Sequence, residues 1–447
     1  MDEKLRIALE SQNPWWSGRS FATGVGRLSW FPELRRYLGA KEILLFIGAR
    51  RTGKSTLVYQ IIQSLLDQGM RKEAILYINL DEPLFVNRAK DPGFIRELIE
   101  DHCTRHSEIT QFTICIDEIQ NFEYWVGTIK TLYDTKPELK IILTGSSSSL
   151  LQREISTRLS GRYFSCTVYP LSFTESLGFS GIDQPTIIRK RQHFSSYLAY
   201  GGFPRVVLEP QDELKKEILK NYYETIYLKD IIYPNNVRNN SDLYDVLYFL
   251  ISNIGNPLSY HRIADTLHIS PDTVREYLGY AENAFLLYAV KKFDYSVKKQ
   301  LANPKKIYCI DTGIINSVAF AFSENRGRLL ENAVFMALKK MHREVYYHKD
   351  RYECDFVVKM HRKIILALQV TESLDNPDTR TREIRGLCEA MEAYSLNEGI
   401  IITLNESGEE MIEGRRVCIL PVYEWLEGIK GAVEPGSSSD LSNPSKK

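Results

Sequence analysis

The sequence predicts an α/β fold whose core is a doubly wound parallel sheet. Five short apolar segments, separated by stretches of helical periodicity, fall at residues 43–47, 75–80, 112–116, 141–144 and 165–169. The first four are apolar at consecutive positions, which is typical of strands buried on both faces. We therefore expect helices on both sides of the sheet.

The bulk composition limits the kind of partner. The 447 residues allow roughly two to four domains. Lys+Arg and Asp+Glu number 57 each, so any signal for nucleic acid or membrane has to be local. The seven cysteines include no C-x-x-C pair, which argues against a zinc site and a disulfide framework. With neither a signal-peptide pattern nor an apolar run near the roughly 20 residues of a membrane helix, we expect a cytoplasmic protein without membrane contact.

Changes in pattern divide the chain into six expected segments. They are a helical preface (1–40), the α/β core (41–175), a mostly helical part (176–240), helices followed by a hairpin (241–310), a mixed α/β part (311–430) and a disordered tail rich in Ser, Pro and Gly (431–447).

A phosphate-binding motif, GARRTGKS, follows the first predicted strand and opens a helix, which is the context that this motif requires. Its backbone N–H groups would wrap the phosphates of ATP, Lys54 would reach the outer phosphates and Ser55 would ligate Mg²⁺. The alternative is a Gly-rich turn that merely resembles the motif. The residues predicted to bind the nucleotide here are Gly48, Arg51, Thr52, Gly53, Lys54, Ser55 and Thr56.

Two carboxylates end the third predicted strand, where open α/β sheets bind ligands. We expect Asp117 to hold Mg²⁺ and Glu118 to orient and deprotonate the attacking water. The strand at 141–144 should lie beside them, and Thr144 or Ser146 would then contact the water or the terminal phosphate. An acidic strand end and a polar strand-to-helix loop are the plainer interpretations.

Two arginines in STRLSGR, Arg158 and Arg162, are candidates for neutralising the charge that develops during phosphoryl transfer, a role often supplied by a neighbouring subunit. Each could equally be a surface or salt-bridge arginine.

These motifs resemble the AAA+ ATPases, and more closely the archaeal and bacterial ATPases grouped with the STAND-type signalling ATPases. Val25-Gly26-Arg27 resembles their adenine-side box, which implies that Arg27 lies at the nucleotide. Gly202-Phe203-Pro204 resembles their lid motif, which implies that Pro204 abuts the nucleotide and that Arg205 can reach the phosphate. The resemblance also implies a homo-oligomer, with a ring as the expected arrangement.

Residues 258–287 read as helix, turn and helix, with Ser270 as N-cap and Pro271 in the first turn, and we predict a winged helix. The following hairpin has one acid and six lysines, which would bind DNA phosphates without reading sequence. A protein-contact module, or lysines that keep an edge hairpin soluble, is the alternative. The candidate recognition helix is acidic apart from one arginine and is a poor groove reader. The basic candidates are Arg275, Lys291, Lys292, Lys298, Lys299, Lys305 and Lys306.

The segments RLLENAVFMALKK, VYYHKDRYECDFVVKM and KIILALQVTESL resemble the PD-(D/E)xK nuclease fold of restriction enzymes and archaeal Holliday-junction resolvases. The resemblance implies a magnesium site made by Glu331, Asp355 and Gln369. Gln369 is a weaker ligand than a carboxylate, and Thr371 replaces the usual lysine, for which Lys363 is a possible substitute. We therefore predict a degenerate, non-catalytic site. The plainer interpretation makes both acids structural or exposed.

Three functions follow from these predictions. The first is an ATP-hydrolysing oligomer that remodels or moves along DNA, including branched DNA. The second is a STAND-type nucleotide-dependent switch with protein partners. The third is an ATP-dependent nuclease.

Overall fold

A computed structural model describes residues 2–27, 34–146, 159–319, 326–341 and 343–428. The chain forms two compact units. The first comprises Met1–Tyr169, Leu228–Pro234 and Asn283–Phe285, and the second comprises Pro170–Tyr227, Asn235–Glu282 and Leu286–Lys447. The tail predicted to be disordered lies outside the described residues. Within those residues, no helix has the length and apolar character needed to cross a membrane.

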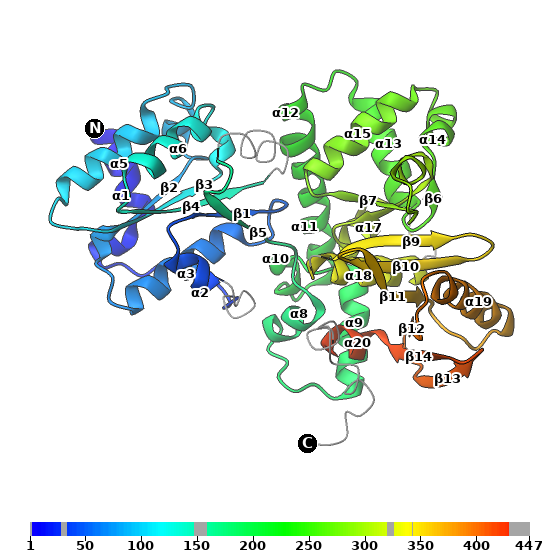
Figure 1. Cartoon of the computed structure of the whole chain (residues 1–447). Coiled ribbons are helices and arrows are strands. Elements are labelled where there is room, and N and C mark those ends of the chain that lie inside the picture. Colours follow the sequence, from blue (N-terminus) through cyan, green and yellow to red (C-terminus); the bar gives the residue numbers. More distant parts are fainter. Residues whose placement is uncertain (1, 28–33, 147–158, 320–325, 342, 429–447) are drawn as a thin grey trace. The chain divides into compact units, whose positions relative to one another are not determined.

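The first unit contains a five-stranded sheet in the order β2-β3-β4-β1-β5, and every neighbouring pair is parallel (Figure 1). The prediction of a parallel core is confirmed, as is the place of β4 beside β3, with Ile116 opposite Leu143. The strands are β1 (Ile43–Ile47), β2 (Ile75–Asn79), β3 (Phe112–Asp117), β4 (Leu139–Gly145) and β5 (Tyr163–Thr167).

Helices cover both faces of this sheet, because alternate strand residues point to opposite sides and apolar side chains lie on both. Leu45 and Ile78 pack with α1, α5 and α6 on one face. Leu44 and Phe46 pack with α2 and α3 on the other. The helices of this unit are α1 (Glu3–Gln12), α2 (Leu34–Gly39), α3 (Lys54–Asp67), α4 (Pro83–Val86), α5 (Phe94–Arg105) and α6 (Trp125–Thr135), with short 3₁₀ turns η1 (Pro14–Ser17), η3 (Lys72–Ala74) and η4 (Ile119–Asn121).

A π-helix, η5 (Ile226–Ile232), is followed by the short α12 (Tyr233–Asn235), and most of this stretch belongs to the first unit. It brings Asp230 into the first unit from a point far along the sequence.

The second unit begins with helices and a small antiparallel sheet in the order β6-β8-β7. Ser270 caps the backbone N–H of Thr273 at 3.0 Å, as predicted for the start of α15. The predicted hairpin is not continuous, because a helix lies between its strands. The elements are α8 (Phe173–Phe179), α9 (Ile187–Tyr200), α10 (Pro204–Val207), α11 (Asp212–Thr225), α13 (Asn240–Ser252), β6 (Pro257–Leu258), α14 (Tyr260–Leu267), α15 (Pro271–Asn283), β7 (Leu287–Lys291), α16 (Val297–Ala302), β8 (Lys305–Cys309) and α17 (Thr312–Val318).

A six-stranded mixed sheet in the order β13-β14-β12-β11-β10-β9 completes the second unit. Its core contains Val357, Ala367 and Ile401 from the strands and Leu387 from α19. The elements are α18 (Arg326–Lys340), β9 (Glu344–Lys349), β10 (Glu353–Met360), β11 (Lys363–Val370), α19 (Pro377–Ala393), β12 (Glu398–Thr403), β13 (Gly408–Ile412), β14 (Arg415–Pro421) and α20 (Val422–Gly428).

Candidate nucleotide site and carboxylate cluster

The phosphate loop joins β1 to α3, and its backbone needs glycine at two positions. Gly48 has φ +146°, and a Cβ atom there would lie 2.2 Å from the carbonyl oxygen of Val168. Gly53, directly before α3, has φ +96°. Arg51 is also left-handed, with φ +66°. Such backbone is typical of loops that turn successive N–H groups toward an anion.

Lys54 and Ser55 occupy the first turn of α3, where the helix presents its positive end. The Lys54 ammonium donates to the carbonyl oxygens of Gly48, at 2.8 Å, and Ala49, at 2.9 Å. Burial lowers the pKa of Lys54, and the carboxylates of Glu118 and Asp117 oppose that shift. An anion at this position would therefore meet a cation already held inside the loop.

The Asp117 carboxylate ends β3 and lies against the start of α3. Its Oδ2 accepts hydrogen bonds from Ser55, at 2.6 Å, and from the Tyr77 hydroxyl, at 2.8 Å, while Thr144 donates to Oδ1. Burial raises the pKa of Asp117, and the hydroxyls of Ser55 and Thr144 oppose that rise. A hydroxyl and a carboxylate side by side form a donor set that suits Mg²⁺. The residues present therefore fit the predicted metal.

Glu118 has a left-handed backbone, with φ +55°, and such strain clusters at functional sites. Its backbone N–H donates to Thr144 Oγ1 at 3.0 Å, which ties β3 to β4. Its carboxylate accepts a hydrogen bond from the Gln120 amide and lies 3.6 Å from Arg50 Nη1. The side chain is thus held at the carboxyl edge of the sheet.

Asp230 completes this arrangement and was not anticipated from the sequence. Its carboxylate lies 2.9 Å from Arg50 Nε and accepts a hydrogen bond of 3.1 Å from Ser146 Oγ. Burial raises the pKa of Asp230, and the charge of Arg50 opposes this. Asp230 Oδ2 and Gln120 Oε1 are buried and have no hydrogen-bond partner among the described residues. The segment KDIIYPN carries no motif that would have revealed this role.

The structure describes only one of the two arginines that were predicted to assist phosphoryl transfer. Arg162 stands directly before β5, at the amino edge of the sheet, where it pairs with Asp134 at 3.0 Å. It is therefore not at the phosphate loop of its own chain, whereas Arg158 lies outside the described residues. The buried Arg27 donates to the carbonyl oxygens of Thr52, at 2.9 Å, and Tyr169, at 3.0 Å, so it supports the loop from within the protein.

The lid-like residues lie in the second unit. Pro204 opens α10, and Arg205 forms an ion pair with Glu209 at 2.8 Å.

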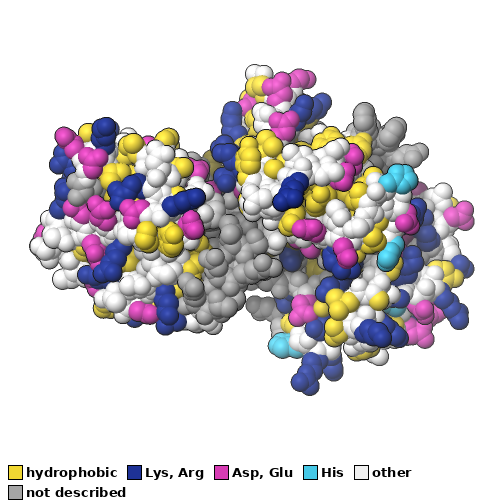
Figure 2. All heavy atoms as spheres, turned by 90° about the horizontal axis from the view of Figure 1, so that it is seen from above, with side chains coloured by type: hydrophobic (Ala, Val, Ile, Leu, Met, Phe, Trp, Pro, Cys, Tyr) yellow, Lys and Arg dark blue, Asp and Glu magenta, His cyan; other side chains and the backbone are white. Residues whose placement is uncertain are grey.

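The basic residues of the middle region are not equivalent. Lys298 and Lys299 are exposed on α16, while Lys291 and Lys292 are half-buried. Lys305 donates to the Tyr260 hydroxyl at 2.8 Å. Arg275 is exposed but pairs with Asp272 at 3.1 Å. The face drawn in Figure 2 intersperses basic and acidic side chains. The prediction that Lys306 contacts DNA is wrong, because its side chain is only 1% exposed and is bound by carboxylates.

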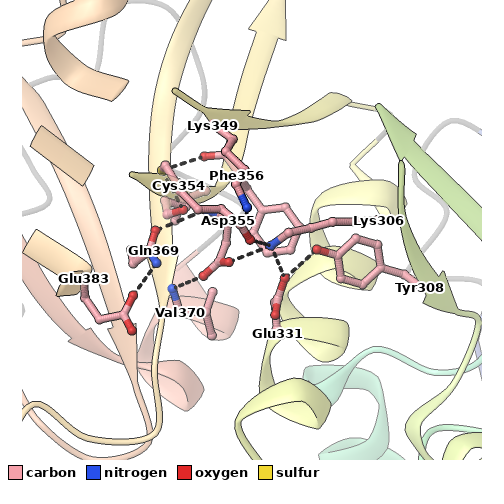
Figure 3. A network of polar contacts seen from close by, with 12 residues as sticks. Lys306, Tyr308, Glu331, Lys349, Cys354, Asp355, Phe356, Gln369, Val370 and Glu383 are labelled. Atoms are coloured by element: carbon pink, nitrogen blue, oxygen red, sulfur yellow. Dashed lines mark hydrogen bonds and ion pairs between the residues drawn. The ribbon is translucent and has the colours of Figure 1, made fainter. Parts of the chain in front are cut away.

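The predicted nuclease-like residues do lie together (Figure 3). Lys306 bridges Glu331 and Asp355, and the Asp355 backbone N–H donates to Gln369 Oε1 at 3.1 Å. Lys363, the suggested substitute lysine, is exposed at the beginning of β11. The lysine that enters the cluster comes instead from β8. Glu353 is a further member that sequence reasoning missed.

Two family models match successive parts of the chain. Residues 40–177 match a family model described as an AAA domain, and residues 191–325 match a domain of unknown function (DUF8612). An uncharacterized protein of Haemophilus influenzae is 32% identical over 412 residues, which covers 90% of this chain and 98% of the relative. An uncharacterized protein of Methanocaldococcus jannaschii is 31% identical over 406 residues, covering 86% of this chain and 88% of the relative.

Similarities to solved structures are more distant. The Aeropyrum pernix Orc1 protein, solved in complex with DNA, is 10% identical with a TM-score of 0.31 and covers 65% of this chain and 91% of that chain. AMPPCP-bound DnaA of Aquifex aeolicus is 14% identical with a TM-score of 0.30, and the match covers 58% of this chain and 89% of that chain. The parallel five-stranded sheet with helices on both faces matches a P-loop AAA+ core.

Proposed function

We propose that this chain, which belongs to the same family as the Haemophilus influenzae and Methanocaldococcus jannaschii proteins and whose residues 40–177 match an AAA domain, is a magnesium-dependent ATPase. The single observation that carries the proposal is the meeting of Ser55, Asp117, Thr144 and Glu118 at the edge of the sheet that also bears the phosphate loop. A generic Gly-rich turn would not need buried carboxylates at this edge.

Each residue then has a definite task. The N–H groups around Gly53 and the Lys54 ammonium bind the phosphates. Ser55 and Asp117 would hold Mg²⁺, which when bound neutralises phosphate charge. Glu118 orients the attacking water and accepts its proton. Thr144 fixes both Asp117 and the backbone of Glu118, so the two carboxylates keep their relative positions.

The direct test is phosphate release from ATP by the purified protein, with Mg²⁺ and with a chelator in excess. Turnover that requires Mg²⁺ is the expected result. Binding of ATP with no turnover under any metal condition would refute the assignment of Glu118 as a base, and absence of binding would refute the site itself.

We further propose that DNA is the effector of this ATPase. The order α13-β6-α14-α15-β7-α16-β8 supplies the helices and the small sheet of the proposed winged helix, with α16 between its last two strands. Exposed Lys298 and Lys299 on α16 accompany Tyr295, which is 80% exposed. Lysines bind phosphates and an exposed aromatic ring can stack on bases, so this region suits DNA without sequence preference. ATP turnover should therefore rise with a four-way junction, duplex or single strand, and the stimulation should fade with salt.

A nucleotide-dependent switch in an oligomer is the second candidate, and the position of Arg50 favours it. Arg50 lies between Glu118 and Asp230, 3.6 Å from the first and 2.9 Å from the second, so a cation stands beside the proposed water-activating group. Such a switch should turn over slowly and change its assembly state between ATP and ADP. A DNA-independent rate together with a nucleotide-dependent mass in light scattering would select it over the DNA-stimulated enzyme.

A further inference from the structure

The carboxylates of the nuclease-like region enclose the ammonium group of Lys306 (Figure 3). Lys306 Nζ lies 3.0 Å from Glu331 Oε1, 2.8 Å from Glu353 Oε1 and 2.8 Å from Asp355 Oδ1. An ammonium group has three N–H donors and no acceptor, so three carboxylates satisfy it completely. No N–H remains to be directed at a substrate, which separates Lys306 from a lysine that positions water or phosphate.

Other polar atoms of this cluster also form hydrogen bonds. Asp355 Oδ2 accepts from the backbone N–H of Val370 at 3.0 Å, and Glu331 Oε1 accepts from the Tyr308 hydroxyl at 2.6 Å. The Gln369 side chain accepts from the Asp355 N–H and donates to Glu383. Magnesium needs several oxygen ligands in nearly octahedral geometry. The residues present do not fit a bound metal, because the Lys306 ammonium occupies the point on which the three carboxylates converge.

The charge of Lys306 persists in this buried position. Burial alone would lower its pKa, but the carboxylates of Asp355 and Glu331 outweigh burial and hold the pKa well above its ordinary value. The lysine also enters from another sheet: β8 pairs with β7 and β6, while Asp355 lies on β10 and Glu331 on α18. A side chain so enclosed and so fully paired is an integral part of the cluster.

We propose that Lys306 is an internal counter-ion that takes the place of a divalent metal, and that the cluster is a latent Mn²⁺ or Mg²⁺ site which opens when this one positive charge is removed. With Lys306 present, a divalent ion would be repelled at close range in a buried environment. Without it, three carboxylates converge with only Lys349, 3.0 Å from Glu353 Oε2, to balance their charge. Carboxylate oxygens are the ligands that these ions prefer. The inference does not rest on the ATPase proposal.

The experiment compares Mn²⁺ binding to the nucleotide-free wild type with Mn²⁺ binding to Lys306→Met. Isothermal titration calorimetry and the electron paramagnetic resonance signal of free Mn²⁺ both measure this binding. Methionine has an unbranched side chain that is one atom shorter than that of lysine, and it removes the charge. We expect the variant to gain one Mn²⁺ site, and Asp355→Asn in the same background to weaken that site on the order of tenfold or more. Lys305→Met is the matched control, since it removes an equal charge one residue away and should gain no site.

Two results would overturn the proposal. One is an Asp355-dependent Mn²⁺ site in the wild type, and the other is a folded Lys306→Met protein that gains no Mn²⁺ site. If Lys306→Met does not fold, the proposal is tested on the wild type by acetylating its lysines and measuring the modification of each lysine by mass spectrometry. Lys306 should stay unmodified with and without excess Mn²⁺ while Lys298 reacts. Modification of Lys306 at the rate of Lys298, or only after Mn²⁺ is added, would refute the proposal.

Discussion

Arg50 and Asp230 form an ion pair, with 2.9 Å between Nε and Oδ1, although 180 residues separate them in the chain. The pair holds the Arg50 guanidinium between Asp230 and Glu118 and thereby limits its pairing with the proposed base. We therefore expect Asp230 to be a positioning residue that acts on Glu118 through Arg50.

Replacing Asp230 by Asn should release Arg50 to pair more closely with Glu118 and so weaken the base. We expect kcat for ATP to fall on the order of tenfold with KM nearly unchanged. Steady-state kinetics measure both constants. Asp67→Asn, an equal charge change at the exposed end of α3, is the control. A rise in KM with constant kcat would show instead that Asp230 supports binding.

Lys54 and Glu118 should separate binding from chemistry. Lys54→Ala removes the cation that meets the phosphates and should abolish or severely weaken ATP binding. Glu118→Gln keeps the size of the side chain and loses only its basicity, so ATP should bind normally and hydrolysis should stop. Equilibrium binding of a fluorescent ATP analogue, together with phosphate release, measures the two effects. Wild-type turnover in Glu118→Gln would remove this residue from the mechanism.

Gly48→Ala should distort the phosphate loop, since the new Cβ would lie 2.2 Å from a backbone carbonyl oxygen. We expect a loss of about 1 to 3 kcal/mol in the free energy of unfolding and no measurable ATP binding. Gly127→Ala on α6, where a Cβ would meet nothing within 4 Å, should instead stabilise the protein by about 0.5 to 1 kcal/mol. Thermal unfolding with and without ATP measures both the stability and the ATP binding of the two variants. Equal changes in Tm and in ATP binding for Gly48→Ala and Gly127→Ala would contradict the strain argument.

His102 should make the first unit sensitive to acid. Its Nε2 donates to the carbonyl oxygen of Glu73 at 2.8 Å and its ring stacks on Trp16, and burial lowers its pKa from 6.5 to about 4. Above the unfolded pKa of 6.5, neither state is protonated. As pH falls from 6.5 toward 4, the unfolded state binds a proton that the folded state excludes, so stability is lost. The loss is at most on the order of 3 kcal/mol.

His102→Gln provides the comparison, because its amide can still donate to Glu73 but does not titrate. We expect the wild-type Tm to fall more than the variant Tm between about pH 7.5 and about pH 5. Parallel Tm curves over this window would show that His102 does not govern the acid response.

Lys298 and Lys299 should carry much of any DNA contact. The double replacement by Ala should weaken binding to duplex and junction DNA alike and should lower the slope of log affinity against log salt by about 2. Fluorescence anisotropy at several salt concentrations gives that slope. Lys216→Ala together with Lys220→Ala on exposed positions of α11 removes the same charge and serves as control. An unchanged slope would place the contact elsewhere.

The first unit was predictable because its signals are local. Strands that are apolar at consecutive positions must be covered by helices on both faces. The phosphate-binding motif occurs between a strand and a helix, so it also predicts β1 and α3. The sheet order followed in part, since Thr144 had to lie beside Asp117 to assist it. Asp230 could not be found this way, because its partners Arg50 and Ser146 lie far from it in the sequence and nothing about KDIIYPN marks it.

The second unit shows a different reason for error. Six lysines near a predicted hairpin indicated a basic surface, yet Lys306 lies on the inner side of β8, with Glu331 and Asp355. Alternation along a strand sends neighbours to opposite faces, so Lys305 and Lys306 have different surroundings. Composition counts charges without assigning faces, and the acids that neutralise Lys306 arise later in the sequence.

The buried position of Lys306 also bears on where this protein can be cut. The small sheet ends at Cys309, which makes 240–310 look like a separable piece. A fragment ending there would carry an unneutralised lysine, and the remainder would keep three carboxylates without their cation. Phe293, whose N–H donates to the Tyr347 carbonyl oxygen at 2.8 Å, would also lose its place in the core of the larger sheet. The two sheets therefore depend on each other for folding. We expect that expressing residues 240–310 apart from the rest of the second unit would leave both fragments insoluble.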